Sequence, residues 1–167
     1  EKWRSSLTLH KTVHLVAGGI ERQDSVYLGI QAVSGQQCEI VVIHDAVRPF
    51  VSSRIIDACV GEARVSGACI VGMPAMETAK LVKSGQIERT LDRNAIWMAQ
   101  TPQAFELGLI RTAHEKARLE RFVGTDDAML VERLGRKIRI IPGSRLNMKI
   151  TTPEDLALAE GILRGEL

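Results

Sequence analysis

The chain has 167 residues, 45% of them hydrophobic, which suits one globular domain with its own core. Its formal net charge of +2 gives no basic footprint for a nucleic acid, and no apolar run approaches the length that spans a membrane. The three cysteines, Cys38, Cys59 and Cys69, lack metal-ligand spacing, and we interpret them as reduced core residues of a cytoplasmic protein.

Strands and helices are predicted to alternate over the first half of the chain. Because Glu1 is not an initiator methionine, we expect further residues to precede it. The spacing of apolar residues predicts strands over 12–16, 39–43 and 68–73, and helices over 22–33 and 53–65. This order of elements is typical of a parallel sheet with right-handed crossovers.

The alternation breaks at residues 75–92, where a β-hairpin arm is predicted. Two short extended runs, 78–82 and 86–91, flank Lys83-Ser84-Gly85, which is a turn signal. The runs are rich in polar and charged residues, and an isolated two-stranded hairpin is only marginally stable in water. We therefore expect the arm to pack on its own domain or on a second subunit.

The last third of the chain returns to helices and short strands. We predict helices over 106–119 and 126–134, a C-cap at Gly135, a half-exposed strand over 137–141, an extended segment over 148–150, and a final helix that begins with Thr152 as N-cap and Pro153 at the first helical position. Because the sequence contains neither a linker nor an internal repeat, we predict one domain over 1–167.

The strand predicted over 39–43 stops abruptly at the segment His44-Asp45-Ala46-Val47-Arg48-Pro49-Phe50. In an open α/β sheet, ligands bind just beyond the carboxyl ends of the strands. This segment therefore places two groups where a ligand site is expected: a carboxylate, which is a candidate metal ligand, and a guanidinium. The structural alternative is that Asp45 only caps the next turn or helix.

Polar residues at other predicted element ends favour a phosphate-rich substrate beside a divalent cation. They are Thr78, Arg93, Thr101, Thr125, Asp126 and Lys149. Arginine and lysine bind phosphates, and a carboxylate can hold magnesium, which bridges phosphate groups. Taken singly, Arg93 and Lys149 fit solvated charges or surface ion pairs, Thr125 fits a helix N-cap, and Thr101 before Pro102 fits turn chemistry. These residues alone therefore indicate only an α/β domain with a candidate phosphate site.

Six ordered motifs resemble the 2-C-methyl-D-erythritol 4-phosphate cytidylyltransferase family over nearly all of the chain. They are Gly18-Gly19-Ile20-Glu21-Arg22-Gln23-Asp24-Ser25-Val26, the segment from His44 to Phe50, Thr90-Leu91-Asp92-Arg93-Asn94 with Trp97, Gln100-Thr101-Pro102-Gln103, Gly124-Thr125-Asp126-Asp127, and Asn147-Met148-Lys149-Ile150-Thr151.

The resemblance implies a three-layer α/β/α, Rossmann-like fold of the nucleotide-diphosphosugar-transferase type, with a protruding β-hairpin arm. It also implies that CTP and methylerythritol phosphate are joined with magnesium, in the bacterial cytoplasm or in a plastid, to give CDP-methylerythritol and pyrophosphate. In the family's reaction the substrate phosphate attacks the α-phosphorus of CTP. Two anions must meet, so cationic positioning is expected to dominate the rate.

The resemblance also implies roles for individual residues. Arg93 and Lys149 would orient and neutralise the attacking phosphate, and Asp45 would lie at the magnesium and sugar end of the site with Arg48 near it. Two further groups are implied: Gly19, Ser25 and Ala46 for the cytidine pocket, and Thr78, Thr101 and Thr125 for methylerythritol phosphate. The arm, residues 75–92, would reach across a homodimer, so that Thr78 and Arg93 serve the neighbouring subunit's site.

These 167 residues depart from the family's pattern in one respect. The family begins with a strand and a glycine-rich loop that cradles the CTP triphosphate, and no such loop occurs here, so we expect the sequence to be N-terminally incomplete. Two alternatives stay open: a ribitol-5-phosphate cytidylyltransferase and a non-catalytic dimerising fragment. The motif Asp92-Arg93-Asn94 with Trp97, and the motif from Gly124 to Asp127, favour the methylerythritol enzyme.

Overall fold

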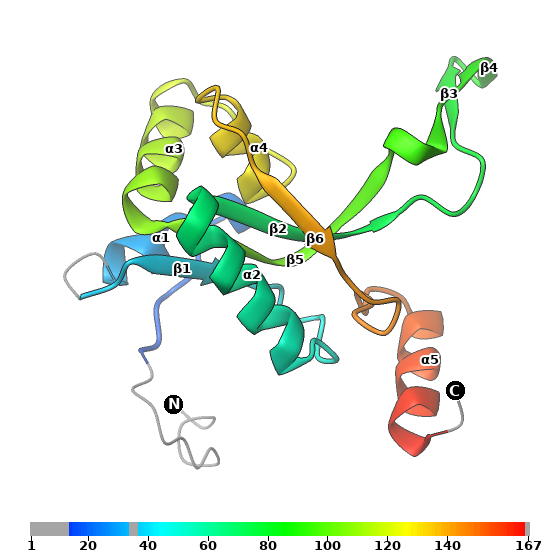
Figure 1. The fold of residues 1–167 in the computed structure, drawn as a ribbon, viewed down its shortest axis with the longest axis horizontal. Coiled ribbons are helices and arrows are strands. Elements are labelled where there is room, and N and C mark those ends of the chain that lie inside the picture. The colour runs from blue at the N-terminus through cyan, green and yellow to red at the C-terminus, as the bar shows by residue number, and fades with distance from the viewer. Residues whose placement is uncertain (1–13, 34–36, 166–167) are drawn as a thin grey trace.

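The computed structural model describes residues 14–33 and 37–165, which form an α/β fold with a projecting hairpin (Figure 1). Four strands make the main sheet, in the order β1 (Ile40–Ile43), β5 (Trp97–Glu106), β2 (Ala68–Pro74) and β6 (Arg139–Pro142). β5 runs antiparallel to both β1 and β2, whereas β2 and β6 are parallel. The sheet is therefore mixed.

The long central strand β5 was not predicted, and its antiparallel pairing makes the predicted parallel sheet a mixed one. β1 and β2 do point the same way and are joined through helix α2 (Ser53–Ser66), but β5 lies between them. Pro102 argues against a central strand because proline cannot donate to the ladder. The structure accommodates it at an irregularity: Ile70 pairs with Gln103 and the next residue, Val71, with Gln100, so Pro102 has no partner in β2.

Helices cover both faces of the sheet and give the three predicted layers. On one face, α2 packs on Cys69, Val71 and Ala104. On the other face, Ala68 and Phe105 join residues of α1 (Arg22–Val33), α3 (Leu107–Leu119) and α4 (Asp127–Glu132). Successive strand residues face opposite sides, as the pleat requires. The α/β/α arrangement expected from the sequence is confirmed.

The predicted hairpin is present as a separate two-stranded sheet. β3 (Lys80–Lys83) and β4 (Gln86–Thr90) pair antiparallel around Ser84 and Gly85, both of which have positive φ. A short 3-10 turn, η2 (Arg93–Ala95), follows it and leads into β5. Every residue of β3 and β4 is exposed, and Figure 1 shows the hairpin standing well away from the main sheet.

The helix ends follow local capping chemistry. Ser52 caps α2, which ends at Gly67 in the left-handed conformation. Thr152 and Asp155 form a capping box at the start of α5 (Pro153–Arg164), as predicted for Thr152 and Pro153. α4 is capped by Asp126 rather than by Thr125, because the Asp126 carboxylate accepts from Met129 N at 2.9 Å.

Two of the predicted extended segments are not strands. Of the strand expected over 12–16, residues 12 and 13 lie outside the described part of the chain, and 14–16 form no strand. Leu15 is 68% exposed, and within the described residues no neighbouring strand pairs with it. The segment 148–150 is likewise irregular, and a hydrogen bond from Ile150 N to Val47 O helps to join it to the loop after β1.

Candidate active site

The loop that follows β1 forms one wall of a pocket. β1 ends at Ile43, and the chain then turns so that Arg48 N donates to the Asp45 carbonyl at 3.0 Å. The Asp45 amide donates to the Thr101 hydroxyl oxygen at 3.0 Å, which ties the loop to the neighbouring strand β5. The predicted strand-end segment is thus fixed to the centre of the sheet.

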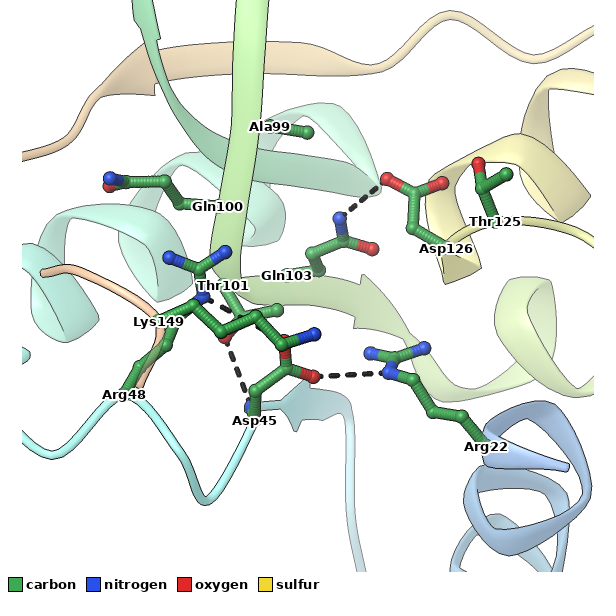
Figure 2. A pocket seen from close by; sticks show the side chains of 10 residues that line it. All are labelled: Arg22, Asp45, Arg48, Ala99, Gln100, Thr101, Gln103, Thr125, Asp126 and Lys149. Carbon is green, nitrogen blue, oxygen red and sulfur yellow. Dashed lines mark hydrogen bonds and ion pairs between the residues drawn. The ribbon is translucent and has the colours of Figure 1, made fainter. Parts of the chain in front are cut away.

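The Asp45 carboxylate faces three cationic side chains (Figure 2). One oxygen accepts from Arg22 Nε at 3.0 Å. The other lies 3.4 Å from Lys149 Nζ and 3.7 Å from Arg48 Nε. Cations from α1, from the loop after β1 and from the segment before α5 therefore meet around one carboxylate.

This surrounding charge determines the ionisation of the site. Burial by itself would raise the pKa of Asp45, but the hydrogen bond and charge of Arg22, with the charge of Lys149, outweigh it and hold the pKa below its ordinary value. Burial would lower the pKa of Arg22, but its bonds to Asp127 and Asp45 raise it. Both groups are therefore charged at neutral pH.

A hydrogen-bonded histidine holds the Asp45 loop from the other side. His44 Nε2 lies 3.0 Å from the Arg48 carbonyl oxygen, which can only accept, so Nε2 carries the proton. His44 Nδ1 lies 3.0 Å from the Thr101 hydroxyl, whose oxygen already accepts from Asp45 N. Each polar group in this relay therefore has a defined partner.

The pocket beside Asp45 has a volume of about 250 Å³. Its lining combines charged and polar side chains with one alanine: Arg22, Asp45, Arg48, Ala99, Gln100, Thr101, Gln103, Thr125, Asp126 and Lys149. Three cations stand against two carboxylates, which leaves a surplus of positive charge. Such a pocket can accept an anionic, hydroxyl-rich ligand.

Six of the eleven residues proposed from the sequence meet in this pocket. They are Asp45, Arg48, Thr101, Thr125, Asp126 and Lys149, contributed by four separate segments of the chain. The alternative of simple turn chemistry is wrong for Thr101, which lies in β5 and accepts from Asp45 N. Lys149 is 45% exposed and lies 3.4 Å from the Asp45 carboxylate, which also agrees with the alternative of a surface ion pair.

Gly19, Ser25 and Ala46 do not line this pocket. Gly19 and Ser25 form a turn at the start of α1, in which Gly19 N donates to the Ser25 hydroxyl at 3.0 Å. A Cβ on Gly19 would lie 2.2 Å from the Cβ of Asp24, so only glycine fits there. Ala46 is exposed beside Asp45. The turn connects to the pocket through Arg22, which belongs to the same helix start.

Thr78 lies in the arm and Arg93 directly after it in η2, and neither is brought to the pocket of its own chain. Both are exposed. Arg93 Nη1 donates to the Met76 carbonyl at 3.2 Å, which places its guanidinium at the root of the arm. Their predicted contact with a neighbouring subunit's site stays a prediction.

Sequence reasoning gave no role to four residues of the pocket wall: Arg22, Ala99, Gln100 and Gln103. Gln103 is buried and donates to the Asp126 carboxylate at 2.8 Å, while its carbonyl accepts from Ala128 N at 3.1 Å. A buried glutamine between polar partners was detectable only once β5 was known to be a strand. Arg22 occupies the first position of α1, where a positive charge interacts unfavourably with the helix dipole. An arginine at such a position could have been recognised from the sequence as a candidate site residue.

The pocket offers a magnesium ion two carboxylates, Asp45 and Asp126, of which Asp126 already caps α4. Among the described residues, no three His, Cys, Asp or Glu side chains are grouped to hold a metal. Magnesium is commonly bound by one or two carboxylates together with substrate phosphates and water, so Asp45 alone fits a substrate-bridged ion.

Over residues 14–33 and 37–165, no helix is long and apolar enough to cross a membrane.

Known proteins resemble this chain in both fold and sequence. The structure superimposes on an enzyme of Anaerococcus prevotii, 4-diphosphocytidyl-2C-methyl-D-erythritol synthase, with a TM-score of 0.88 and 32% identity, covering 94% of this chain and 73% of that one. The 2-C-methyl-D-erythritol 4-phosphate cytidylyltransferase of Thermus thermophilus gives a TM-score of 0.80 at 35% identity, covering 89% and 72%. The fold is that of the α/β nucleotidyltransferases on which it superimposes.

The sequence profile of the IspD family, 2-C-methyl-D-erythritol 4-phosphate cytidylyltransferase, matches residues 2–165. A relative of that name from Geobacter metallireducens is 50% identical over 159 residues, covering 94% of this chain and 68% of its own length. Another, from Syntrophus aciditrophicus, is 54% identical over 159 residues, covering 95% and 68%. The chain belongs to the IspD family.

Proposed function

We propose that this chain is a single cytidylyltransferase domain that joins CTP to 2-C-methyl-D-erythritol 4-phosphate. The main support is that the Asp45 carboxylate lies beside three cations, Arg22, Arg48 and Lys149, in one pocket of a chain of this family. An oxygen of the acceptor phosphate attacks the α-phosphorus of CTP, the bond between the α-phosphorus and the bridging oxygen breaks, and pyrophosphate leaves. The product is CDP-methylerythritol.

The pocket's part in this reaction is positioning and charge neutralisation. Lys149 is 45% exposed, which leaves its ammonium accessible to a phosphate from the solvent side. Arg48 Nη1 is held by the Asn147 carbonyl at 2.8 Å, so this guanidinium is fixed before substrate arrives. Preorganised cations that meet developing negative charge are the main source of rate in phosphoryl chemistry.

Asp45 is the residue that would hold a magnesium ion. Such an ion, when bound, would neutralise triphosphate charge as the pyrophosphate leaves. The depressed pKa of Asp45 keeps an oxygen ligand ionised. Thr101 and Thr125 would contact the hydroxyl groups and phosphate of the acceptor, and the turn of Gly19 and Ser25, with Ala46, would read cytidine.

The arm, residues 75–92, is proposed to make a homodimer and to carry Thr78 and Arg93 into the partner's site. Its support is the complete exposure of β3 and β4, including apolar Val82 and Ile87, and the marginal stability of a lone hairpin. A cytoplasmic location is proposed from the cysteines: Cys59 and Cys69 are neighbours in the core and remain unpaired thiols.

Pyrophosphate release from CTP tests the function. The chain is incubated with magnesium and either methylerythritol phosphate or ribitol 5-phosphate, and CTP binding is followed separately by calorimetry. We expect faster release with methylerythritol phosphate. Faster release with ribitol 5-phosphate would instead assign the ribitol activity, and a chain that neither binds CTP nor releases pyrophosphate would be a non-catalytic dimerising module.

A further inference from the structure

Arg22 joins two carboxylates that belong to different parts of the molecule. Its Nε donates to Asp45 at 3.0 Å, and its Nη1 donates to Asp127 at 2.7 Å. Asp45 follows β1, whereas Asp127 begins α4. One planar guanidinium therefore fixes the distance between the two segments, which a single-point cation such as lysine cannot do with the same geometry.

Asp127 is itself held by a buried histidine. The Asp127 side chain is 1% exposed, and its second oxygen lies 3.0 Å from Nε2 of His114, which is 0% exposed. His114 Nδ1 is buried with no hydrogen-bond partner. A charged imidazole would leave a buried N–H unpaired there, so the geometry favours a neutral ring that donates from Nε2 to Asp127. Arg22 is then the counter-charge of this carboxylate.

The same helix start also fixes the loop before α4 and the turn of Gly19 and Ser25, named the nucleotide turn here because it is proposed to read cytidine. Gln23, next to Arg22, donates to the Phe122 carbonyl at 3.0 Å and accepts from Gly124 N at 2.9 Å. The turn of Gly19 and Ser25 lies at the same end of α1. Arg22 is thus the point where the nucleotide turn, the Asp45 loop and the Thr125 segment are joined.

We infer that Arg22, supported by the buried Asp127–His114 pair, is a positioning residue that holds Asp45 and the nucleotide turn in one frame for transfer. Its planar, two-point contact aims one Asp45 oxygen at Arg22 and leaves the other facing Lys149 and the pocket. The inference rests on the proposed function, because the frame is useful only where two substrates must be aligned. A misaligned pair of reactants loses rate more than binding.

The kinetic test compares Arg22→Lys with Arg139→Lys. Arg139 makes a similar Nε contact, 3.2 Å to Glu62, on a surface away from the pocket. We expect Arg22→Lys to lower kcat at least tenfold with a KM for each substrate within threefold of wild type, and Arg139→Lys to leave both unchanged. An Arg22→Lys protein that folds as wild type and keeps its kcat would overturn the inference.

A second measurement does not depend on activity and so separates this inference from the proposed function. Nitrogen-15 NMR of the arginine Nε–H groups is recorded for the wild type and for Asp127→Asn, a nearly isosteric change. We expect hydrogen exchange at Arg22 Nε to speed up at least tenfold in Asp127→Asn, while that of Arg139 stays the same. Unchanged exchange at Arg22 would show that Asp127 does not support it, whatever the enzyme assay gives.

Discussion

The pocket and the arm are built in opposite ways. Around the pocket, side chains from distant segments bond to one another: Arg22 contacts both Asp45 and Asp127, and Asn147 bonds to the Thr101 carbonyl at 2.8 Å. On the arm, backbone pairing carries the structure, with the side-chain bond from Lys80 to Thr90 at 2.6 Å as a cross-strand addition. The pocket's geometry is thus set within one chain, whereas the arm's exposed side chains acquire a role only when another surface meets them.

Asp127→Ala should break the pocket's support most severely. The change leaves buried His114 without its acceptor and removes one counter-charge of Arg22, for an expected loss of about 3 kcal/mol in the free energy of unfolding. Urea denaturation followed by circular dichroism measures it. Glu88→Ala, on the exposed strand β4, is the matched acidic control and should stay within about 0.5 kcal/mol of wild type. Equal losses in the two variants would contradict the contrast between pocket and arm.

Lys149→Ala tests the pocket's chemistry apart from its stability. Lys149 is 45% exposed, so its removal should cost little folding free energy, yet turnover should fall roughly 10²-fold because one preorganised cation is lost from the transition state. Steady-state pyrophosphate release measures this. Lys137→Ala, an exposed lysine outside the pocket, should turn over as the wild type does. A Lys149→Ala enzyme of near-normal rate would remove Lys149 from the proposed mechanism.

Arg93→Ala tests whether the arm contributes to the active site of a partner subunit. If the arm serves a partner's site, Arg93→Ala alone should also lose roughly 10²-fold in turnover. Mixing it with Lys149→Ala subunits should then restore roughly a quarter of wild-type activity, since half of the random dimers are mixed and each mixed dimer regains one intact site. Pyrophosphate release after mixing and re-equilibration is the measurement. No recovery in verified mixed dimers would place Arg93 in its own chain's site or outside the chemistry.

The sequence predicted the parts of the site that follow strand ends. Asp45 and Arg48 directly follow β1, so topology brings them to the edge where ligands bind, whereas Lys149 lies in an irregular segment between β6 and α5. Helix bounds were also predictable where caps are local, as at Thr152. These features depend on neighbours within a few residues.

The remaining parts depend on contacts far apart in the chain. β5 was not predicted because it contains Pro102. The irregular pairing with β2 that accommodates this proline cannot be inferred from the local sequence. Gln103 and Arg22 were missed for a related reason: their partners Asp126 and Asp127 lie at least 23 positions away. The resemblance named Thr78 and Arg93, but local spacing holds no information about a second subunit.

The smallest expected effect is a pH dependence that belongs to the pocket and not to the arm. The pKa of Asp45 is lowered in the folded chain: burial opposes the shift, and the bonds and charges of Arg22 and Lys149 outweigh it. Its contribution to stability is therefore present above the ordinary pKa of 3.8 and is lost as the pH falls through the lower folded value. Asp45→Asn should be less stable than wild type by about 1 kcal/mol at neutral pH, since the partners are partly solvated.

That difference should shrink as the pH falls below 3.8, because the wild-type carboxylate then becomes protonated as well. Urea unfolding of both proteins between neutral and acidic pH gives the difference curve. Asp57→Asn, at an exposed position of α2, should stay within about 0.5 kcal/mol of wild type at neutral pH. A difference for Asp45→Asn that instead grows on acidification would mean that the three cations do not stabilise the ionised form. The pocket would then be, like the arm, a surface whose charges are organised only by what binds to it.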